Sequence, residues 1–391
     1  MKTVAHYKAG PFVPLTENWM SNMISRMGAY RQVVYCHRRQ NLRLYAGLKV
    51  RSLGLKGRVR PWAFINNRLC DTLGYYPGLR LFLLLDRPAL LHAHFGPSGT
   101  RMMRLAEAEG IPLVTSFYGY DVGMLPSKWP ECRELYRRLF ERGRLFLAEG
   151  PFMAERLKEL GCPEDKLTVH RLGVDLEAVR WEPRLPGEDG EVRLLIAASF
   201  REKKGIPLAI RAFALAQRRR PSLKMRLSVV GDSPGFPETE QEKRRILEEV
   251  ESSGCGDRVE MLGYCDRRGF LEQLYRNHIF LSPSITARDG DSEGGAPVAI
   301  IEASASGMPV LSTFHCDIPQ VVLHGTSGLL SREGDVEELA ANLEELALNP
   351  HRWEEMGRRG RSHVEERFDL DRQARGLEAL YDEVLSEAGA G

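Results

Sequence analysis

The chain has 391 residues, 43% of them hydrophobic, and its 55 Lys and Arg nearly balance its 53 Asp and Glu. This composition is typical of a folded globular protein and excludes disordered, collagen-like and disulfide-stapled chains. Because single hydrophobic cores stop growing at roughly 250–300 residues, the length predicts two domains.

The seven cysteines are scattered along the chain, and no two of them form a CxxC pair. Such spacing favours reduced thiols in a cytosolic protein over a disulfide framework or a zinc site. No N-terminal apolar stretch is long enough for a signal peptide, and the longest apolar run, at 81–85, is too short to cross a bilayer. We therefore expect a cytoplasmic protein whose only membrane contact would be peripheral.

The net charge of +2 hides an uneven distribution along the chain. Residues 1–100 contain 15 Lys and Arg against three Asp and Glu, and no acidic residue lies between Glu17 and Asp71. An excess of this size predicts a positive field over part of the first domain and an anionic partner, such as lipid headgroups, phosphates or nucleic acid. A solvated basic face without a partner is the alternative.

Short apolar runs alternate with helical patterns in the first half, which is typical of βα units around a parallel sheet. Strands are predicted at 32–35, 90–95, 112–117, 145–148 and 167–171, and helices at 99–109, 131–142 and 151–160.

A second series begins after 176–191, where Pro, Gly and acidic residues gather between regular elements. Strands are predicted at 192–198, 224–230, 259–262, 279–282 and 309–312, and helices at 207–219, 238–252, 268–277, 297–306, 336–348, 351–368 and 370–385. Two successive series imply two doubly wound α/β domains. Ligands of such sheets bind at the carboxyl ends of the strands, so we expect the site in a cleft there.

The segment at 288–309, RDGDSEGGAPVAIIEASASGMP, follows a predicted strand, crosses a glycine-rich loop and opens a helix. Gly294 and Gly295 would let backbone amides approach a ligand, and the helix N-terminus suits a phosphate. Glu293 and Glu302 would then face one bound nucleotide sugar, with Glu302 accepting ribose hydroxyls. The alternative is a turn shaped by the glycines, followed by a surface carboxylate.

This segment resembles the hallmark of the retaining family 4 glycosyltransferases of GT-B fold, in which two glutamates flank a Gly/Pro-containing loop and a helix is followed by a small-residue run, Gly and Pro-Val, here Gly307, Pro309 and Val310. Further matches follow in order along nearly the whole chain. The first, FVPLTENWMSNMI, is similar to the acceptor-side loop of exopolysaccharide and colanic-acid-type members. The others are HAHFG at 92–96, SFYGYD at 116–121, EGPFMAERLKELGCPEDKLTVHRLGVD at 149–175, SFREKKGI at 199–206, VVGDSP at 229–234 and TSGLL at 326–330.

The resemblance implies two facing Rossmann-like, doubly wound domains and a C-terminal helix that crosses back to the first. An acceptor-binding domain is expected at 1–178, together with the helix at 369–391. A donor-binding domain for the nucleotide sugar is expected at 179–368.

On the donor side, the resemblance places the diphosphate beside Lys204 of KKG, whose charge would stabilise the leaving group. The family usually has Gly-Arg where this chain has Ala198 and Ser199, so Ser199 and Arg201 are the expected donor-binding residues there, and Arg201 is the candidate to replace that arginine. Glu293 and Glu302 enclose eight residues where the family has seven, and the glycine loop would absorb the extra residue. Glu293 is expected near the transferred sugar, in a pocket lined by Gly294, Gly295, Ala296 and Pro297.

On the acceptor side, the family commonly has a histidine where SFYGYD places Tyr118. Tyr118 and Asp121 are therefore candidates for catalytic contacts with the sugar and the acceptor. The other acceptor-side candidates are Glu17, Asn18, His94 and Gly96. For His94 and its neighbour His92, the alternative is a strand-end histidine satisfied by the backbone.

Retention of configuration in this family is usually explained without a protein nucleophile, because the donor phosphate helps to deprotonate the acceptor hydroxyl on the same face. We therefore expect no general base and no cofactor besides the donor substrate. Asp289, Gly290 and Asp291 spell the DxD of metal-dependent transferases of another fold. In this context they are expected to form a turn, and no metal is predicted.

The resemblance implies transfer of a hexose from a UDP- or GDP-sugar to a saccharide acceptor, lipid-linked in our interpretation, during cell-surface or exopolysaccharide biosynthesis. Residues 38–60, in which leucines alternate with basic residues, are expected to dock on the anionic inner face of the membrane. No RNA-binding motif supports a nucleic-acid partner. The alternatives are a GT-B epimerase or phosphorylase, or a non-catalytic module that binds anionic lipid, and release of nucleoside diphosphate with and without acceptor separates them.

Overall fold

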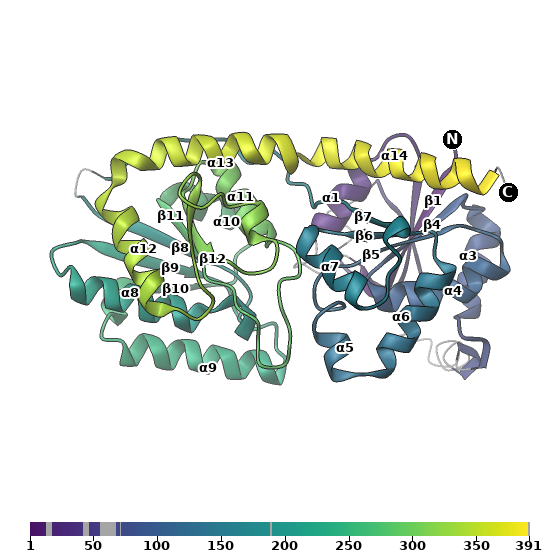
Figure 1. Cartoon of the computed structure of the whole chain (residues 1–391), viewed down its shortest axis with the longest axis horizontal. Coiled ribbons are helices and arrows are strands. Elements are labelled where there is room, and N and C mark those ends of the chain that lie inside the picture. Colours follow the sequence, from purple (N-terminus) through teal and green to yellow (C-terminus); the bar gives the residue numbers. More distant parts are fainter. Residues whose placement is uncertain (13–17, 42–46, 55–67, 71, 188–189, 390–391) are drawn as a thin grey trace. The chain divides into compact units, whose positions relative to one another are not determined.

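The computed structural model describes residues 1–12, 18–41, 47–54, 68–70, 72–187 and 190–389 (Figure 1). The chain divides into two compact units: unit 1 is formed by 1–173 with 370–391, and unit 2 by 174–369. The expected domains are 1–178 with 369–391, and 179–368. The expected boundary between the first and second unit, after residue 178, thus lies a few residues later than the boundary in the structure, after residue 173. The predicted candidate Glu17 lies outside the described residues.

Unit 1 contains a parallel sheet whose strands lie in the order β3-β2-β1-β4-β5-β6-β7. The strands are β1 (Thr3–Phe12), β2 (Arg31–Arg39), β3 (Lys49–Ser52), β4 (Leu90–His94), β5 (Leu113–Ser116), β6 (Leu145–Ala148) and β7 (Leu167–Val169). Strand β1, which pairs with β2 and β4 inside the sheet, was not predicted, because His6 and Lys8 interrupt its apolar residues. Both side chains are nevertheless buried.

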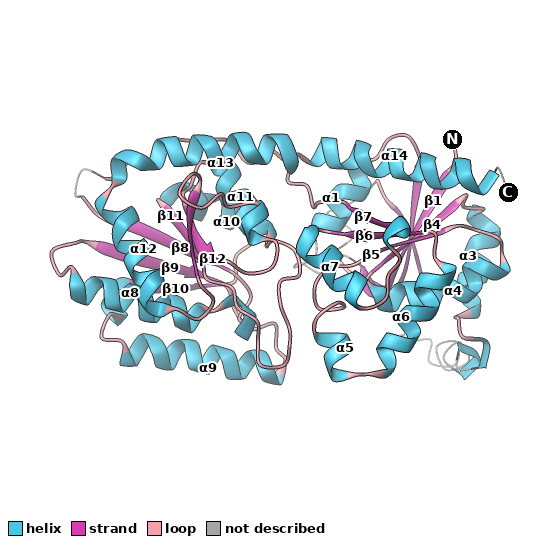
Figure 2. Cartoon of the chain, viewed as in Figure 1, coloured by secondary structure: helices cyan, strands magenta, loops and turns pink. Residues whose placement is uncertain are grey.

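Helices cover both faces of this sheet (Figure 2). On one face pack α3 (Pro77–Asp86), α4 (Gly96–Ala108), α6 (Glu131–Arg142) and α7 (Pro151–Glu159). The other face is covered by α1 (Asn18–Arg26) and the C-terminal α14 (Leu370–Gly389). The short α5 (Met124–Lys128) and η3 (Glu164–Lys166) belong to the same unit.

The C-terminal helix belongs to unit 1, as predicted for a crossing helix. Its Glu378 accepts a hydrogen bond of 2.7 Å from the backbone N–H of Ala29, and the Tyr381 hydroxyl lies 2.6 Å from Nδ1 of His92. The hydroxyl of Tyr30 donates to Asp382. These contacts fix α14 on the sheet face that it shares with α1. In the described part of the chain, no helix is both long and apolar enough to cross a membrane.

Unit 2 repeats the architecture with a parallel sheet in the order β10-β9-β8-β11-β12-β13. Its strands are β8 (Val192–Ala197), β9 (Met225–Val230), β10 (Val259–Gly263), β11 (Ile279–Ser282), β12 (Val310–Thr313) and β13 (Gly328–Ser331). The longer helices are α8 (Ile206–Arg219), α9 (Pro237–Ser252), α10 (Arg267–Arg276), α11 (Val298–Ser306), α12 (Val336–Leu348) and α13 (Trp353–Arg367). The 3₁₀ turns are η4 (Glu202–Lys204), η5 (Gly256–Arg258), η6 (Ile318–Gln320) and η7 (Pro350–Arg352). Two such sheets confirm the predicted fold class, two Rossmann-like doubly wound domains.

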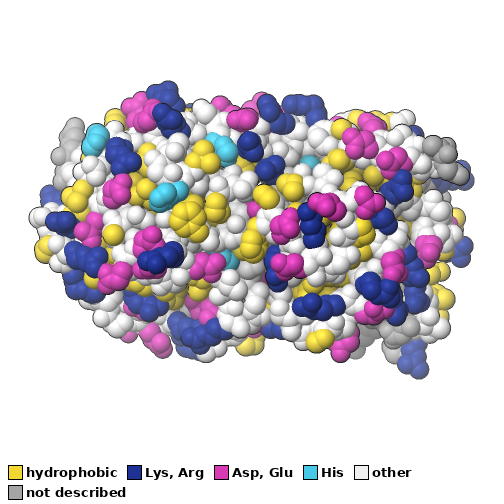
Figure 3. Space-filling view, viewed as in Figure 1, with side chains coloured by type: hydrophobic (Ala, Val, Ile, Leu, Met, Phe, Trp, Pro, Cys, Tyr) yellow, Lys and Arg dark blue, Asp and Glu magenta, His cyan; other side chains and the backbone are white. Residues whose placement is uncertain are grey.

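The basic stretch of the first 100 residues acquires an acidic partner through the fold. Asp86, at the end of α3, is buried, and its carboxylate lies 2.7 Å from Nζ of Lys49 and 2.6 Å from Nε of Arg51. Both basic residues belong to the edge strand β3. A count of charges along the sequence of 38–60 therefore overstates the positive charge that is left without an acidic neighbour, because two of its basic residues pair with Asp86. Residues 42–46 and 55–60 of this stretch lie outside the described residues. On the face shown in Figure 3, basic and acidic side chains are interspersed.

Candidate active site

In unit 2 the strand order reverses between β8 and β11, and the loops that leave these two strands carry the predicted donor residues. Gly205, which ends η4, has a φ of 61°, and a Cβ there would lie 2.0 Å from the carbonyl oxygen of Pro283. The N–H of Ile285 donates to the carbonyl of Lys203 over 2.9 Å. The glycine of KKG thus lets the two loops lie against each other.

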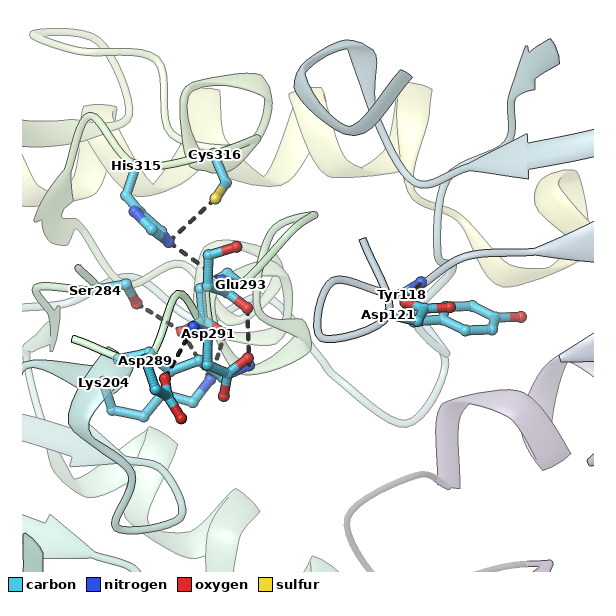
Figure 4. Close-up of polar contacts among 11 residues, drawn as sticks. Tyr118, Asp121, Lys204, Ser284, Asp289, Asp291, Glu293, His315 and Cys316 are labelled. Carbon is cyan, nitrogen blue, oxygen red and sulfur yellow. Dashed lines mark hydrogen bonds and ion pairs between the residues drawn. The ribbon is translucent and has the colours of Figure 1, made fainter. Parts of the chain in front are cut away.

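Lys204 and Glu293 meet where these loops join (Figure 4). Nζ of Lys204 lies 2.8 Å from each carboxylate oxygen of Glu293, and the Ser284 hydroxyl donates to the same carboxylate over 2.8 Å. Their side chains are only 16% and 5% exposed. Two residues that the resemblance assigned to the donor site, 89 positions apart, are therefore one buried ion pair.

The charges of this pair are shaped by burial and by each other. Burial alone would raise the pKa of Glu293, but the Lys204 and Lys203 charges and the hydrogen bonds from Lys204 and Ser284 lower it to about 2. Burial lowers the pKa of Lys204, and the Glu293 charge opposes this change. A buried ammonium with one carboxylate partner is a suitable cation for a phosphate that displaces the carboxylate.

The DxD-like sequence forms a turn, as predicted. The N–H of Asp291 donates to the Asp289 carboxylate over 3.0 Å, and Gly290 between them has a φ of 82°. The Asp291 carboxylate lies 3.1 Å from Nζ of Lys203, a second ion pair beside the first. The two aspartates are therefore engaged in loop structure and in lysine pairing.

Glu302 lies on α11 and pairs with Arg267, at the start of α10. Burial raises the pKa of Glu302, while the Arg267 charge and hydrogen bond oppose that rise. The sequence alone does not indicate Arg267, because nothing local links it to a glutamate 35 residues away. Its only local signal is its position after Asp266, whose side chain caps α10 by accepting from the N–H of Gly269.

The loop that carries Glu293 has a second support that the sequence analysis missed. Nε2 of the buried His315 accepts a hydrogen bond of 3.2 Å from the N–H of Glu293, and Nδ1 lies 2.7 Å from a carboxylate oxygen of Glu333. The other Glu333 oxygen accepts from the N–H of Thr286 over 2.9 Å. Cys316 Sγ lies 3.1 Å from the His315 ring, and burial raises the pKa of this thiol to about 12.

The remaining predicted donor residues line the same loops. Gly294, buried, has a φ of 74°, and the N–H of Gly295 donates to the carbonyl of Glu293 over 3.0 Å. Ala296 is half-buried and Pro297 precedes the first residue of α11. Ser199 is half-buried and accepts the N–H of Arg201 on its carbonyl. The Arg201 side chain is exposed, so its part in donor binding stays a prediction.

In unit 1 the strand order reverses between β1 and β4, and Asp121 organises the loops at that end. Its buried carboxylate accepts the N–H groups of Gly96, over 2.8 Å, and of Tyr118, over 2.9 Å. A Cβ at Gly96 would lie 2.4 Å from the hydroxyl oxygen of Tyr136, which donates to the Asp121 carbonyl. Asp121 therefore holds the loop that carries Tyr118, and its predicted catalytic role remains a prediction.

Three buried histidines lie on the sheet face under α1 and α14. His6 and His92 are partners in the β1–β4 register, and His94 follows on β4. Each ring nitrogen of His92 has a side-chain partner, Tyr381 or Ser116, so side chains and not the backbone satisfy this ring. Within the described ranges, these three are the one His/Cys/Asp/Glu group with metal-ligand spacing, their ligand atoms lying within 4.8 Å of one another.

A cavity of about 20 Å3 adjoins this cluster. Its lining includes Tyr118, His94, Glu149 and His170, together with side chains of α1 and α14. Space of this size admits one water molecule or one hydroxyl group. Asn18, another predicted acceptor-side residue, is half-buried at the first position of α1.

Comparison with known proteins matches both units to glycosyltransferases. Residues 21–178 match the family described as Glycosyltransferase Family 4, and residues 180–363 match Glycosyl transferases group 1. A Salmonella typhimurium protein named for colanic acid biosynthesis, the glycosyltransferase WcaL, is 35% identical over 299 residues, or 75% of this chain and 70% of that protein. The amylovoran biosynthesis glycosyltransferase AmsK of Erwinia amylovora is 32% identical over 65% of this chain and 60% of its own length.

Solved structures share the fold at low sequence identity. Anabaena HepE, solved in complex with UDP, superposes with a TM-score of 0.77 at 16% identity, over 98% of this chain and all of that chain. Sucrose-phosphate synthase of Thermosynechococcus elongatus gives a TM-score of 0.78 at 15% identity, over 99% of this chain and all of its own. With the family matches and the colanic-acid relative, these findings confirm the predicted resemblance: the chain belongs to the family 4 glycosyltransferases and has the GT-B fold.

Proposed function

We propose that this glycosyltransferase moves a hexose from a UDP- or GDP-sugar to a saccharide acceptor in exopolysaccharide biosynthesis. The observation that carries the proposal is the buried Lys204–Glu293 pair at the switch point of unit 2. A nucleotide sugar leaves its diphosphate behind, and the negative charge that develops needs a preorganised cation. Lys204 is such a cation at the place where doubly wound sheets bind nucleotides.

The donor would be held from two directions in unit 2. The backbone amides at the start of α11 suit the diphosphate, because the first N–H groups of a helix have no intrahelical partner. Glu302, on the same helix, would accept the ribose hydroxyls while Arg267 keeps its carboxylate ionised. HepE was solved with UDP and with UDP-glucose, so UDP-sugars are the first donors to test.

We propose that transfer proceeds with retention and without a metal ion. The residues around Lys204 offer a cation for the leaving phosphate, and the two aspartates of the DxD-like turn pair with Lys203 or cap the turn. The donor phosphate would take the acceptor proton on the same face of the sugar. Turnover that is abolished by EDTA and restored only by magnesium or manganese would contradict this part of the proposal.

Unit 1 would bind the acceptor, a saccharide attached to a lipid carrier at the inner face of the membrane. Arg38 and Arg39, at the end of β2, remain candidates for contact with anionic headgroups in a cytoplasmic, peripherally bound protein. Flotation with vesicles of phosphatidylcholine and phosphatidylglycerol tests this. Binding should fall with salt and in R38Q/R39Q, whereas K158Q, a change of a half-buried lysine of α7 that pairs with two glutamates, should leave it unchanged.

The donor proposal is tested by a thermal-shift screen against nucleotide sugars, since a ligand that binds only the folded state raises its stability. The winning donor should lose its shift in K204M and E302Q but keep it in K158Q. The protein should release nucleoside diphosphate from that donor when a polyprenyl-diphosphate saccharide is added as acceptor, and should release none without it. An undiminished shift in both K204M and E302Q would overturn the proposed donor site.

A further inference from the structure

A chain of side-chain hydrogen bonds runs through the buried histidines of unit 1 and ends at Tyr118. Oε1 of Gln32 lies 3.0 Å from Nε2 of His6, and Nδ1 of His6 lies 2.9 Å from Nε2 of His94. Nδ1 of His94 lies 2.7 Å from the hydroxyl oxygen of Tyr118. His6 and His94 are only 0% and 4% exposed, so bulk solvent does not compete for these contacts.

Gln32 sets the direction of the chain. Its amide nitrogen donates to the carbonyl of Tyr30 over 3.2 Å, so its amide oxygen faces His6 and can only accept. Nε2 of His6 must therefore carry a hydrogen. The hydrogen-bond series starts from a fixed acceptor, the Gln32 amide oxygen. Each of the two imidazoles that follow then has one remaining nitrogen that can bond to the next side chain.

Burial keeps both imidazoles neutral. It lowers the pKa of His6 to about 4 and the pKa of His94 well below its usual value. A neutral imidazole has one N–H and one bare nitrogen. Since Nε2 of His6 holds its hydrogen, Nδ1 of His6 accepts from Nε2–H of His94, and Nδ1 of His94 accepts from the Tyr118 hydroxyl.

The geometry points to His94 as a positioning residue: with His6 and Gln32 behind it, His94 fixes the hydroxyl proton of Tyr118 toward the protein interior. Tyr118 then presents lone pairs, and not its proton, to a hydroxyl group in the adjoining 20 Å3 cavity. This inference rests on the proposed function of unit 1 as the acceptor-binding unit. It assigns no proton storage to the histidines, because the lowered pKa of His6 opposes a charge there.

The fixed direction gives the site a preference. A tyrosine hydroxyl that is free to rotate can donate to a ligand oxygen or accept from a ligand hydroxyl. Once it donates to His94, it selects groups that donate, such as a sugar hydroxyl, and disfavours a ligand group that can only accept, such as a methyl ether at that position.

The first test reads the tautomers directly in the intact wild-type protein. Two-bond ¹⁵N–¹H correlation spectra of the chain with ¹⁵N-labelled histidine distinguish Nε2–H from Nδ1–H rings. We expect His6 and His94 as neutral Nε2–H tautomers at pH 7, assigned with H6Q and H94N. An Nδ1–H tautomer at either ring, an imidazolium, or one equivalent of zinc in the purified protein that is lost in H6Q would overturn the proposed series of hydrogen bonds.

The second test measures energetic coupling between His94 and Tyr118. We expect Y118F and H94L each to lower kcat/KM for the acceptor by about tenfold, the size of a lost hydrogen bond with a buried partner left behind. The double variant should lose no more than either single variant, because His94 acts through the Tyr118 hydroxyl. H94N, whose amide oxygen reproduces the position of Nδ1, should recover part of the loss.

H92N is the matched control. His92 belongs to the same cluster but bonds with Tyr381 and Ser116, so its loss should multiply with that of Y118F. Multiplicative losses for H94L and Y118F would overturn the inference. A wild-type protein that turns over no nucleotide sugar would overturn the proposed function instead, and the tautomer spectra would still decide the hydrogen-bond chain.

Discussion

Nζ of Lys204 lies 2.8 Å from both carboxylate oxygens of Glu293, and both side chains are largely buried. The lysine that the proposed function assigns to the donor diphosphate is thus already paired. A diphosphate would enter as a competitor for the ammonium, and Glu293 would turn to another hydrogen-bond donor, of which the transferred sugar offers several. The pair keeps two charges buried until the donor replaces one partner.

Removing Lys204 from this pair should lower both the free energy of unfolding and the affinity for the nucleotide, and a second substitution at Glu293 should separate the two effects. K204M leaves a buried carboxylate without its cation, so unit 2 should lose about 3 kcal/mol of stability, the usual cost of breaking a buried pair. K204M/E293Q removes both charges and should recover most of that loss without restoring nucleotide binding. Urea unfolding and titration calorimetry with UDP measure the two effects.

The matched control for these variants is K243M, which removes a lysine from the exposed Lys243–Asp232 pair and should change the unfolding free energy by less than about 1 kcal/mol. A double variant as unstable as K204M would contradict the assignment of the loss to an unpaired carboxylate. UDP binding at wild-type strength in the double variant would contradict the role of Lys204.

The ion pair of Glu302 with Arg267 predicts pH-dependent donor binding. Burial raises the pKa of Glu302, and the Arg267 charge opposes that rise, so R267A should raise the pKa further. Donor affinity needs the carboxylate to accept hydroxyls, so it should weaken as the pH falls, and in R267A the weakening should begin at a higher pH. Calorimetric titration with UDP between pH 8 and pH 5.5 measures this, with R268A at the exposed neighbour as control. An unchanged pH profile in R267A would refute the coupling.

His315 should act on donor affinity through the loop that carries Glu293. H315A removes the acceptor of the Glu293 N–H and releases the Glu333 carboxylate, so the loop loses two of its connections. We expect the KM for the donor to rise about tenfold, as for a lost buried hydrogen bond, with a smaller change in kcat. C316S, next to it, should leave KM within about twofold, and a change in kcat alone in H315A would argue against a positioning role.

The sequence predicted the order of most elements and both sheets, because buried parallel strands appear as short apolar runs between helices. It failed at β1, where the buried His6 has hydrogen-bond partners far along the chain, Gln32 and His94, and the buried Lys8 donates to the nearby carbonyl of Pro11. It also failed at β13, where Gly328 packs against the carbonyl oxygen of Val310 and weakens the apolar pattern. Tertiary partners, which no local window contains, decided both strands.

The candidate site divides in the same way. The sequence motifs predicted Lys204, Glu293 and Glu302 as donor-site residues, because glycines and carboxylates next to the end of a strand give a local signal. The residues that hold them, Arg267 and His315, have no such signal, since each meets its partner only after folding. The pairing of Lys49 and Arg51 with Asp86 could not be predicted for the same reason, because Asp86 comes from outside the acid-free stretch, and the membrane contact of this stretch stays a prediction.

Asp86 makes unit 1 sensitive to acid. Burial would raise its pKa, but hydrogen bonds and charges from Arg51 and Lys49 lower it to about 2, below its ordinary 3.8. A carboxyl whose pKa is lower in the folded state stabilises the protein above the ordinary pKa and loses that contribution as the pH falls through 3.8 toward 2. D86N should therefore destabilise unit 1 by roughly 2 kcal/mol at pH 7, and the gap to wild type should shrink to about half at pH 3. Urea unfolding at the two pH values measures the gap, with E159Q, in the exposed pair with Arg156, as a control that should change little at either pH. A gap that stays constant between pH 7 and pH 3 would show that Asp86 stabilises β3 by packing and not by its charge.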